Sequence, residues 1–505
     1  MEREYYNLYT QTNVDPEKER RALQELLIHL GQEAAQQQIE RNCSSGHLDR
    51  LIRKSLEGAA LHMDLPVEKL EKQCHEIAAA IGRRLPSNRF ELVDLGERFR
   101  PHSCCAGMQK LLYGGLKGIA EFCSILSPEP ACFPELTEYL RSTLAYLQLP
   151  GLPEREWMEL VAECCRMCRY TQQLLETELR KRYGVPEPVR VRISPLAGKG
   201  ILVLGMDLQV LAKLLELSNG QNIRIYTGGE LLAAHAYPFF QQYPQLAGNY
   251  GSSGTKKQHK ELLQFPGPVL VTSACFKNDF SEIADHCFSG GSVWSRGLTH
   301  LQDNELQTLI DKANEMPGFD FDESERFVMT GFGREALEKR VPEISSLLIE
   351  KKLKRICIVG GCDHENNESG YSPELVQLLP PDVLILTFGC GKYHFHRKSL
   401  GGIGSLPRLL DAGQCFDICG IMSFLRMLAA SLEVQEEELP VTFFCNWNEQ
   451  RTIPVLLTLL TGSFKEIFVH GSIPEDILES LQKFRNIRLT SSPQKDLASL
   501  DPELR

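Results

Sequence analysis

The sequence predicts an α/β protein in which an all-helical N-terminal domain precedes two parallel α/β domains. Three observations predict this fold class. Apolar residues recur at helical spacing through residues 1–196, and after Pro195 short apolar runs alternate with amphipathic helices. The chain has 505 residues, which is too long for a single hydrophobic core. We therefore expect domains at 1–196, 197–352 and 353–505.

The first 196 residues contain several helix signals. Asp15-Pro16 is typical of a helix start, because an Asp side chain caps free N–H groups and proline fits the first turn. Leucines then follow at helical spacing from Leu23 to Leu30. Further helices are predicted at 46–62, 66–84, 106–126, 133–148 and 154–183. This pattern predicts one or two small helical bundles.

The remainder of the chain contains short apolar runs bounded by Gly and Pro and separated by helices. Such runs are typical of buried parallel strands. The predicted strands are 201–205, 222–226, 268–274, 326–331, 355–360, 383–388, 440–444 and 466–470. A charged helix at 333–352 precedes the boundary between the two α/β domains.

Charge and hydropathy exclude several classes of partner. The net charge is −11 and there is no basic run with interleaved aromatics, so we expect no nucleic-acid partner. No stretch reaches the roughly 20 apolar residues that a membrane span needs, and the N-terminus has no secretory pattern. We expect a cytoplasmic protein without a membrane partner. In a reducing compartment its 17 cysteines would more often be metal ligands or catalytic groups than disulfides.

Three predicted strands end in a cysteine, namely Cys275, Cys362 and Cys390, and Cys415 follows in a turn before an apolar helix. Parallel α/β sheets place ligands outside the carboxyl ends of their strands. Thiolates delivered to that edge are the soft ligands that Fe–S clusters need. The alternative is that these cysteines are small hydrophobic residues filling buried strand ends. Gly361 and Gly389 directly before their cysteines, and Gly413 two residues before Cys415, favour a cluster, since glycine permits close approach of backbone.

Two acidic residues occupy matching positions. Glu230 follows the strand 222–226, and Glu449 follows the strand 440–444. As hard oxygen ligands they would suit a cluster that contains an oxo-bridged iron. Each could equally be an acid at a helix N-terminus, where the helix dipole favours negative charge.

Several co-linear motifs resemble the hybrid-cluster protein (hydroxylamine reductase) family. They cover about residues 190–490, with a weaker match at 112–124 around Gly115-Leu-Lys-Gly-Ile-Ala120. The motifs are Gly248-Asn-Tyr-Gly251, 265–275 (FPGPVLVTSAC), 359–363 (VGGCD), 386–393 (LTFGCGKY), 406–415 (LPRLLDAGQC) and 447–450 (WNEQ). The resemblance implies a helical domain followed by two Rossmann-like domains, in agreement with the pattern of strands and helices.

The resemblance also implies a cofactor and an activity. The family holds a hybrid iron–sulfur–oxygen cluster and reduces hydroxylamine or nitric oxide. It implies as cluster ligands Glu230, Cys275, Cys362, Cys390, Cys415 and Glu449, with Cys362 at the position of a persulfidated cysteine. Glu449 and Cys362 are the implied catalytic residues. The partners would be a small nitrogen-oxide substrate and an unidentified electron-donor protein.

The sequence departs from the family pattern at three places. Met206 stands where the family has a histidine ligand, and Arg451 where it has a lysine that could deliver a proton. The N-terminal Cys-x-x-Cys motif of a second, 4Fe–4S cluster has no counterpart, because the first cysteine is Cys43. Two alternatives therefore stay open: a cluster-bearing sensor or scaffold without turnover, and a metallocluster enzyme of the carbon monoxide dehydrogenase type.

The helical domain contains cysteines that a second cluster could use. These are Cys104, Cys105, Cys123, Cys132, Cys164, Cys165 and Cys168. On a helix Cys164 and Cys168 share one face, but buried helical cysteines are common core residues. We predict that Cys164, Cys165 and Cys168 do not form a complete 4Fe–4S site. We further predict that His394 and His396 lie in a solvated loop, and that four sulfurs converge with the carboxylates of Glu230 and Glu449, namely those of Cys275, Cys362, Cys390 and Cys415.

Overall fold

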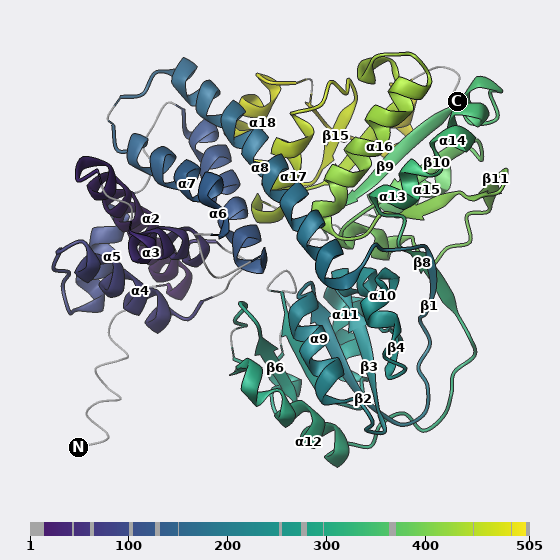
Figure 1. Cartoon of the computed structure of the whole chain (residues 1–505), viewed down its shortest axis with the longest axis horizontal. Helices are drawn as coiled ribbons and strands as arrows, with labels where there is room; N and C mark the ends of the chain where they lie inside the picture. Colours follow the sequence, from purple (N-terminus) through teal and green to yellow (C-terminus); the bar gives the residue numbers. More distant parts are fainter. Residues whose placement is uncertain are drawn as a thin grey trace.

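The computed structural model describes residues 15–42, 45–60, 65–99, 105–126, 132–149, 151–251, 255–273, 280–295, 297–362, 370–447, 449–485 and 487–500. A helical region, one α/β unit built on each of two sheets, and a long helix running between them make up the architecture (Figure 1). This arrangement confirms the predicted fold class.

The N-terminal region is helical, as predicted. Its helices are α2 (Pro16–Glu40), α3 (Gly46–Gly58), α4 (Val67–Ala80), α5 (Arg89–Glu97), α6 (Ala106–Leu126), α7 (Pro134–Tyr146) and α8 (Glu154–Tyr183). The start of α2 follows the prediction, because the Asp15 carboxylate accepts the N–H of Glu17 at 3.0 Å and Pro16 is the first helical residue. The short helix α5 has no clear apolar periodicity and was not predicted.

The first sheet has six parallel strands in the order β4-β3-β2-β5-β6-β7. Its strands are β2 (Lys199–Gly205), β3 (Ile223–Gly228), β4 (Leu246–Asn249), β5 (Val269–Thr272), β6 (Cys287–Gly290) and β7 (Thr299–Leu301). The accompanying helices are α9 (Leu208–Leu217), α10 (Pro238–Gln241), α11 (Thr255–Leu263) and α12 (Gln307–Glu315). The central strands were predicted, whereas the short strands β4, β6 and β7 were not.

The second sheet also has six parallel strands, in the order β13-β10-β9-β14-β15-β16. They are β9 (Arg355–Gly361), β10 (Val383–Thr387), β13 (Leu409–Asp411), β14 (Val441–Asn446), β15 (Ile467–His470) and β16 (Ile487–Leu489). The helices of this unit are α15 (Tyr371–Leu378), α16 (Ile418–Ser431), α17 (Glu449–Leu459), α18 (Glu475–Gln482) and α19 (Pro493–Ala498). A small hairpin joins β11 (Gly402–Ile403) to β12 (Leu406–Pro407).

Two predictions between the sheets need correction. The strand at 326–331 exists as β8 (Phe327–Thr330), but it pairs antiparallel with β1 (Val189–Arg192) and joins neither parallel sheet. The helix at 333–352 is two helices, α13 (Arg334–Glu338) and α14 (Val341–Ile349). The break comes just before Pro342 in the first turn of α14, because proline lacks the N–H that a continuous helix would need.

Helix α6 packs closely against α17 and α8 through its glycines. A Cβ on Gly118 would lie 2.3 Å from Cγ of Pro454, and one on Gly115 would lie 2.3 Å from Sγ of Cys164. Gly115 and Gly118 belong to the motif at 112–124, and their lack of a side chain lets the two partner helices approach. The helical region therefore supports α17, the helix that begins at Glu449.

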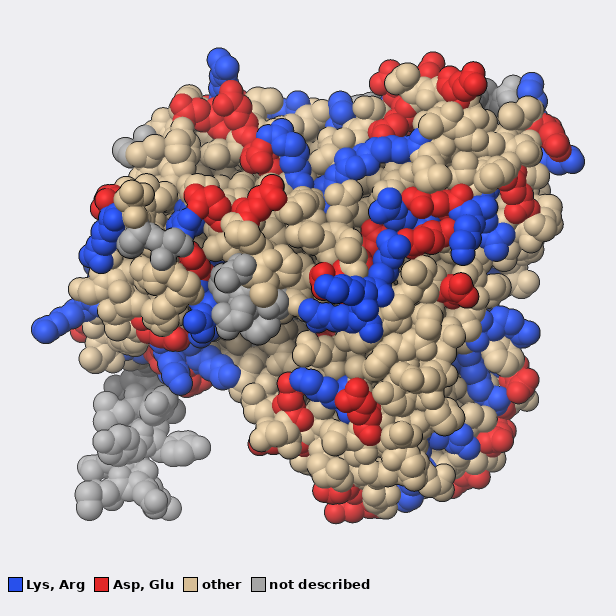
Figure 2. Space-filling view, viewed as in Figure 1, with Lys and Arg blue, Asp and Glu red and all other residues tan. Residues whose placement is uncertain are grey.

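The surface carries charges of both signs. On the face shown in Figure 2, Lys and Arg side chains lie interspersed with Asp and Glu. No helix among the described residues is both long enough and apolar enough to cross a membrane.

Candidate metal centre

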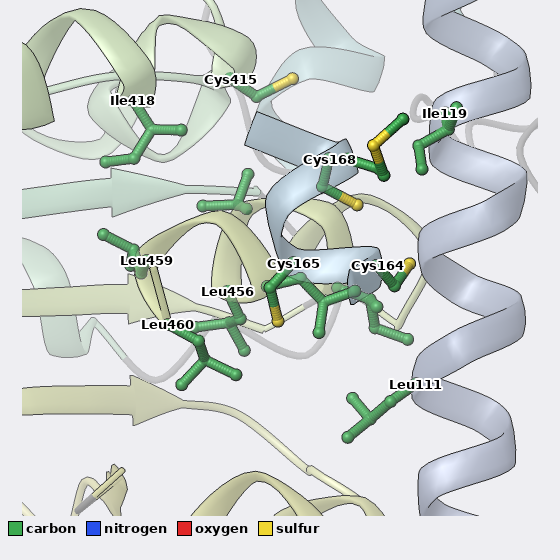
Figure 3. Packing of buried hydrophobic residues seen from close by; sticks show 14 of the residues in the cluster. Leu111, Ile119, Cys164, Cys165, Cys168, Cys415, Ile418, Leu456, Leu459 and Leu460 are labelled. Atoms are coloured by element: carbon green, nitrogen blue, oxygen red, sulfur yellow. The ribbon is translucent and has the colours of Figure 1, made fainter. Parts of the chain in front are cut away.

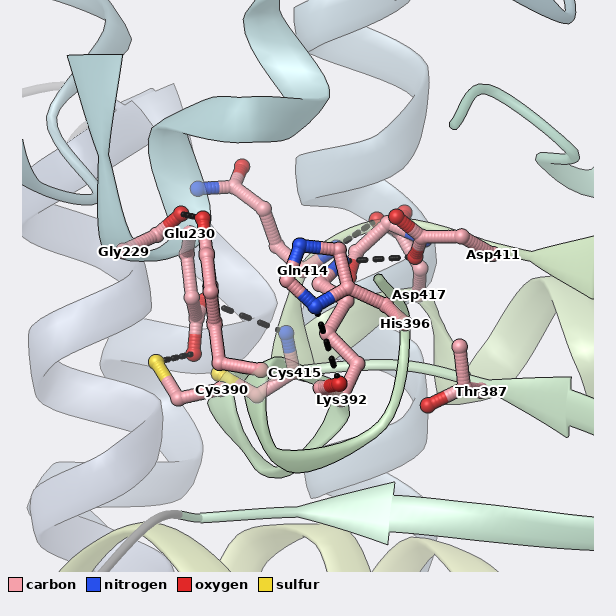
Figure 4. Close-up of polar contacts among 12 residues, drawn as sticks. Gly229, Glu230, Thr387, Cys390, Lys392, His396, Asp411, Gln414, Cys415 and Asp417 are labelled. Atoms are coloured by element: carbon pink, nitrogen blue, oxygen red, sulfur yellow. Dashed lines mark hydrogen bonds and ion pairs between the residues drawn. The ribbon is translucent and has the colours of Figure 1, made fainter. Parts of the chain in front are cut away.

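Glu230 connects the two α/β units. It lies in the 3₁₀ turn Gly229–Ala236 that follows β3, and only 7% of it is exposed. Its Oε1 lies 3.6 Å from Sγ of Cys390, and its Oε2 accepts the backbone N–H of Cys415 at 3.2 Å (Figure 4). One carboxylate from the first sheet thus contacts two cysteine residues of the second.

Three predicted cysteine ligands follow three adjacent strands of the second sheet. Cys362 follows β9, Cys390 begins the 3₁₀ turn after β10, and Cys415 begins the 3₁₀ turn after β13. Because these parallel strands are neighbours, their carboxyl ends lie along one edge of the sheet. All three residues are buried. The strand β13 explains the position of Cys415, which the sequence had placed only in a turn.

The glycines before these cysteines make room for neighbouring protein atoms. Gly389 has φ 68°, and a Cβ there would lie 2.6 Å from the carbonyl oxygen of Gly361. Gly413 has φ 126°, and a Cβ there would lie 2.3 Å from Oδ2 of Asp417. Both positions require glycine on backbone grounds. This reason differs from the predicted one, in which the glycines admitted an inorganic core.

A fully buried ion pair fixes the turn that carries Cys415. Lys392 is 0% exposed, and its Nζ lies 2.6 Å from Oδ1 of Asp411 and donates to the carbonyl of Gly413 at 2.8 Å. The same Asp411 oxygen accepts the N–H of Gly413 at 3.0 Å. These contacts tie the turn after β10 to the turn after β13, so the positions of Cys390 and Cys415 depend on each other.

A second group of contacts ties the two units together beside Glu230. The hydroxyl of Tyr393 donates to the carbonyl of Gly229, and Asn249 Nδ2 donates to that hydroxyl at 3.2 Å. Burial raises the pKa of Tyr393 well above its usual value, so the phenol stays protonated as a donor. Gly229 directly precedes Glu230, and these hydrogen bonds therefore hold the backbone from which the carboxylate projects.

Two of the predicted ligands cannot be placed from side chains. Cys275 falls in 274–279, outside the described residues. Glu449 is the first residue of α17, and Arg451 lies in its first turn, but only their backbone is described. The predicted convergence of all six ligands therefore stays a prediction. The structure brings together Glu230, Cys390 and Cys415, and it places Cys362 on the same sheet edge.

The candidate ligands that the structure describes are three buried cysteines and one buried carboxylate. Within the described part of the chain, no three His, Cys, Asp or Glu side chains meet closely enough to hold one metal ion. A cluster of several irons spreads its ligands around its circumference, so its thiolates need not touch one another. Buried thiols on one sheet edge with a carboxylate 3.6 Å from one of them combine soft and hard donors, which suits an Fe–S metallocluster.

Met206 lies beside this centre. It follows β2 directly, is 8% exposed, and its carbonyl accepts Nε2 of Gln414 at 3.2 Å. Gln414 directly precedes Cys415. The residue at the family's histidine position is therefore hydrogen-bonded to the chain neighbour of a predicted ligand. The departure noted in the sequence therefore falls next to the chemistry.

The cysteines of α8 lie in the helical interior (Figure 3). Cys164 and Cys168 share one face, as predicted, with their sulfurs 4.0 Å from the carbonyl of Leu112 and 3.9 Å from that of Gly115. A hydrogen bond with Cys164, together with burial, raises the pKa of Cys168 well above its usual value. Burial also raises the pKa of Cys165. The Cys165 and Cys168 thiols therefore stay protonated, as in a hydrophobic core. The absence of a complete cluster site among the α8 cysteines stays a prediction.

Several residues of the centre were not predicted. They all lie within motifs of the resemblance: Lys392, Tyr393, Asp411 and Gln414. A charged residue next to an apolar strand is the sequence signal that could have revealed Lys392 and Asp411. The prediction for His396 was wrong. It is 7% exposed, its Nδ1 lies 3.1 Å from the carbonyl of Lys392, and burial lowers its pKa to about 3.

Comparisons with known proteins agree with this arrangement. The model of the Prismane/CO dehydrogenase family matches residues 22–478. That match extends beyond residues 190–490 and 112–124, where the motifs of the resemblance lie, into most of the helical region. The chain is 38% identical over 413 residues to a hydroxylamine reductase of Lawsonia intracellularis, covering 78% of this chain and 75% of that protein. It is 35% identical over 401 residues to a hydroxylamine reductase of Solidesulfovibrio magneticus, with 78% and 74% covered.

Solved structures with a similar fold are carbon monoxide dehydrogenases. The enzyme of Thermococcus sp. AM4 matches with a TM-score of 0.57 and 14% identity, over 95% of this chain and 84% of that chain. Carbon monoxide dehydrogenase IV of Carboxydothermus hydrogenoformans matches with a TM-score of 0.57 and 13% identity, over 95% and 86%. At such identities the likeness shows the fold alone. With the family match and the identities to its relatives, we conclude that the chain belongs to the Prismane/CO dehydrogenase family.

Proposed function

We propose that this protein is an Fe–S oxidoreductase that reduces hydroxylamine or a related small nitrogen oxide. The proposed cofactor is a hybrid iron–sulfur–oxygen cluster held by Glu230, Cys275, Cys362, Cys390, Cys415 and Glu449. Relatives with the name hydroxylamine reductase at 33–38% identity support the substrate class. The observation that carries the proposal is the contact of Glu230 with both Cys390 and Cys415 across the two sheets.

The protein's own groups would hold and shield the site. Glu230, Cys390, Cys415 and Cys362 are each less than 10% exposed, so bulk water is excluded from the reacting centre. The Lys392–Asp411 pair and the Tyr393–Gly229 hydrogen bond fix the ligand-bearing turns before any cofactor binds. Such preorganisation lowers the cost of positioning ligands around a rigid cofactor.

When bound, the cluster would supply the electrons for cleavage of the N–O bond. Reduction of hydroxylamine to ammonia and water takes up two electrons and two protons, so an electron-donor protein must deliver reducing equivalents. The chain must therefore present a docking face for a redox partner, and it must let protons reach a buried site.

The test is anaerobic purification followed by iron, sulfide and nickel quantification, EPR, and turnover of hydroxylamine with a chemical reductant. We expect iron and sulfide without stoichiometric nickel, and reductive turnover. Cys390→Ser and Glu230→Gln should each lower iron per chain. The matched controls Cys357→Ser, a buried cysteine inside β9, and Glu216→Gln, an exposed carboxylate on α9, should keep the parent iron content.

Three outcomes would contradict the proposal in different ways. A bound cluster without turnover under any reductant would favour a sensor or scaffold. Nickel at one atom per chain would favour a carbon monoxide dehydrogenase-type centre. Equal iron loss in Cys357→Ser and Cys390→Ser would remove the sheet edge as the cluster site.

A further inference from the structure

A cavity of about 460 Å³ lies between the helical region and the first α/β unit. Its walls come from α6, α8, the start of α9 and the segments before β7 and α12. Its outer rim is exposed, at Gln209, Gln302 and Asn304, and its inner wall is buried, at Met206 and Phe416. The cavity therefore leads from the surface inward, and it ends at the residue that departs from the family pattern.

The inner wall of the cavity contains the residue that directly precedes the candidate ligand Cys415. Gln414 lines the cavity, is 1% exposed, and donates from Nε2 to the carbonyl of Met206. The next residue, Cys415, donates its backbone N–H to Glu230 at 3.2 Å. Met206 and Gln414 thus separate the cavity from the Glu230–Cys415 side of the site.

The two residues of this wall differ in how they can move. The backbone of Met206 is held by Gln414, but its side chain is unbranched, with several rotatable bonds, and can change rotamer without moving the backbone. A histidine bound to a metal at this position could not swing away. Met206 can therefore open and close a passage in a way that a ligand residue cannot.

The apolar inner wall of the cavity favours an uncharged substrate. The lining contains two cations, Arg182 and Lys213, and two carboxylates, Asp207 and Asp303, so its charges balance; Lys213 pairs with Asp303. The Asp207 carboxylate caps α9 by accepting the N–H groups of Gln209 and Val210 at 2.9 and 3.0 Å. To pass the buried apolar wall of Met206 and Phe416, an anion such as nitrite would have to lose part of its hydration shell. Neutral hydroxylamine would lose much less on the same path.

We propose that this cavity is the route by which a small, uncharged N–O compound reaches the candidate metal centre, with the Met206 side chain as its inner gate. The substrate class rests on the proposed function, but the route and the gate do not. The proposal predicts that small neutral reagents reach Cys415 through the cavity, that reagents of equal size with a negative charge reach it more slowly, and that the gate sets both rates.

The test uses the full chain without its cluster and two alkylating reagents of similar size, neutral iodoacetamide and anionic iodoacetate. Modification of Cys415 is followed by peptide mass spectrometry, with exposed Cys132 as the internal reference. Asn304→Trp fills the rim, and Asn219→Trp is the matched control, an exposed asparagine after α9 that does not line the cavity. Met206→Ala opens the gate.

We expect Asn304→Trp to slow alkylation of Cys415 by about tenfold, similar to the smaller changes in association rate among mutants of one binding interface. Asn219→Trp should leave the rate unchanged and Met206→Ala should raise it. The ratio of the iodoacetamide rate to the iodoacetate rate should be higher at Cys415 than at Cys132. With the loaded enzyme, Asn304→Trp should lower kcat/KM for hydroxylamine and leave kcat unchanged. If Asn304→Trp fails to fold, Gln209→Trp at the same rim replaces it.

The two proposals fail separately. If the loaded protein does not turn over hydroxylamine but the alkylation pattern is as expected, the proposed function fails and the route stands. If Asn304→Trp and Gln209→Trp leave alkylation of Cys415 unchanged, the route is wrong whatever the activity. If iodoacetate reacts as readily as iodoacetamide relative to Cys132, the selection for uncharged compounds is wrong.

Discussion

The Lys392–Asp411 pair offers the sharpest test of how the ligand-bearing turns are held. Both side chains are almost completely buried, at 0% and 2% exposure, and Nζ lies 2.6 Å from Oδ1. Lys392→Met would leave a buried carboxylate whose Oδ2 already has no hydrogen-bond partner and whose Oδ1 keeps only the N–H of Gly413. Removing one partner of a buried pair costs about 3–5 kcal/mol.

We therefore expect Lys392→Met to lower the thermal midpoint by about 10 °C, since a loss of 1 kcal/mol shifts the midpoint of a large domain by about 2–4 °C. The double variant Lys392→Met with Asp411→Asn removes the charge and keeps an acceptor for Gly413. It should recover most of the loss, because a neutral buried group needs no counter-charge. The exposed pair Lys352–Glu350, at 67% and 52% exposure, gives the control Lys352→Met, which should leave the thermal midpoint nearly unchanged.

The assay is circular dichroism during heating, on parent and variants without cofactor, so that cluster binding does not add to stability. The reasoning is refuted if Lys392→Met is no less stable than Lys352→Met. It is also refuted if the double variant is as unstable as the single one, because the loss would then come from packing rather than from an unpaired charge.

Three further predictions concern the gate residue, one buried acid and one helix contact. Met206→His, at a position 8% exposed beside Gln414, should raise iron per chain or hydroxylamine turnover, because imidazole is a stronger iron ligand than a thioether. Equal iron and turnover in parent and variant would show that the lack of a histidine here limits neither iron binding nor activity. Burial is the main cause that raises the pKa of Glu176 from 4.5 to about 7, so the folded state binds the proton more tightly and the parent loses stability as pH rises through this window. Glu176→Gln should then become more stable relative to the parent between about pH 5 and pH 8, by up to about 3 kcal/mol, and a constant difference in thermal midpoint across that range would contradict it. Gly118→Ala should destabilise the α6–α17 contact by about 1–3 kcal/mol, because its Cβ would lie 2.3 Å from Pro454. The control Gly46→Ala, with no atom within 4 Å of its Cβ, should leave stability unchanged. Equal thermal midpoints for the two variants would contradict this prediction.

Sequence periodicity determined the long helices and the central strands, because those elements bury a face that recurs at a fixed spacing. It did not reveal β4, β6, β7, β13 or β16. These strands have three or four residues each, too few to show a period, and pairing with a neighbouring strand is what makes them strands. The strand at β8 was predicted, but its antiparallel pairing with β1 was missed, because the two strands are more than a hundred residues apart.

The same division applies to the candidate metal centre. The sequence placed Cys362 and Cys390 at strand ends, because a strand followed by a cysteine is a local feature. The residue pattern could not show that Glu230 meets Cys390, since the two are 160 residues apart and follow strands of different sheets; that expectation rested on the family resemblance. Only the packing of the two α/β units decides that contact.

Burial of polar groups was likewise decided by tertiary structure. The polar histidines of His394-Phe395-His396 predicted a solvated loop, yet His396 is buried against the backbone of Lys392. Lys392 would be expected at the surface from its type, and it is fully buried because Asp411 and the Gly413 carbonyl satisfy it. The sequence by itself determined which residues could serve as ligands, because residue type sets chemistry. The tertiary structure decided which of them meet, because only folding brings a charge and its partner together away from water.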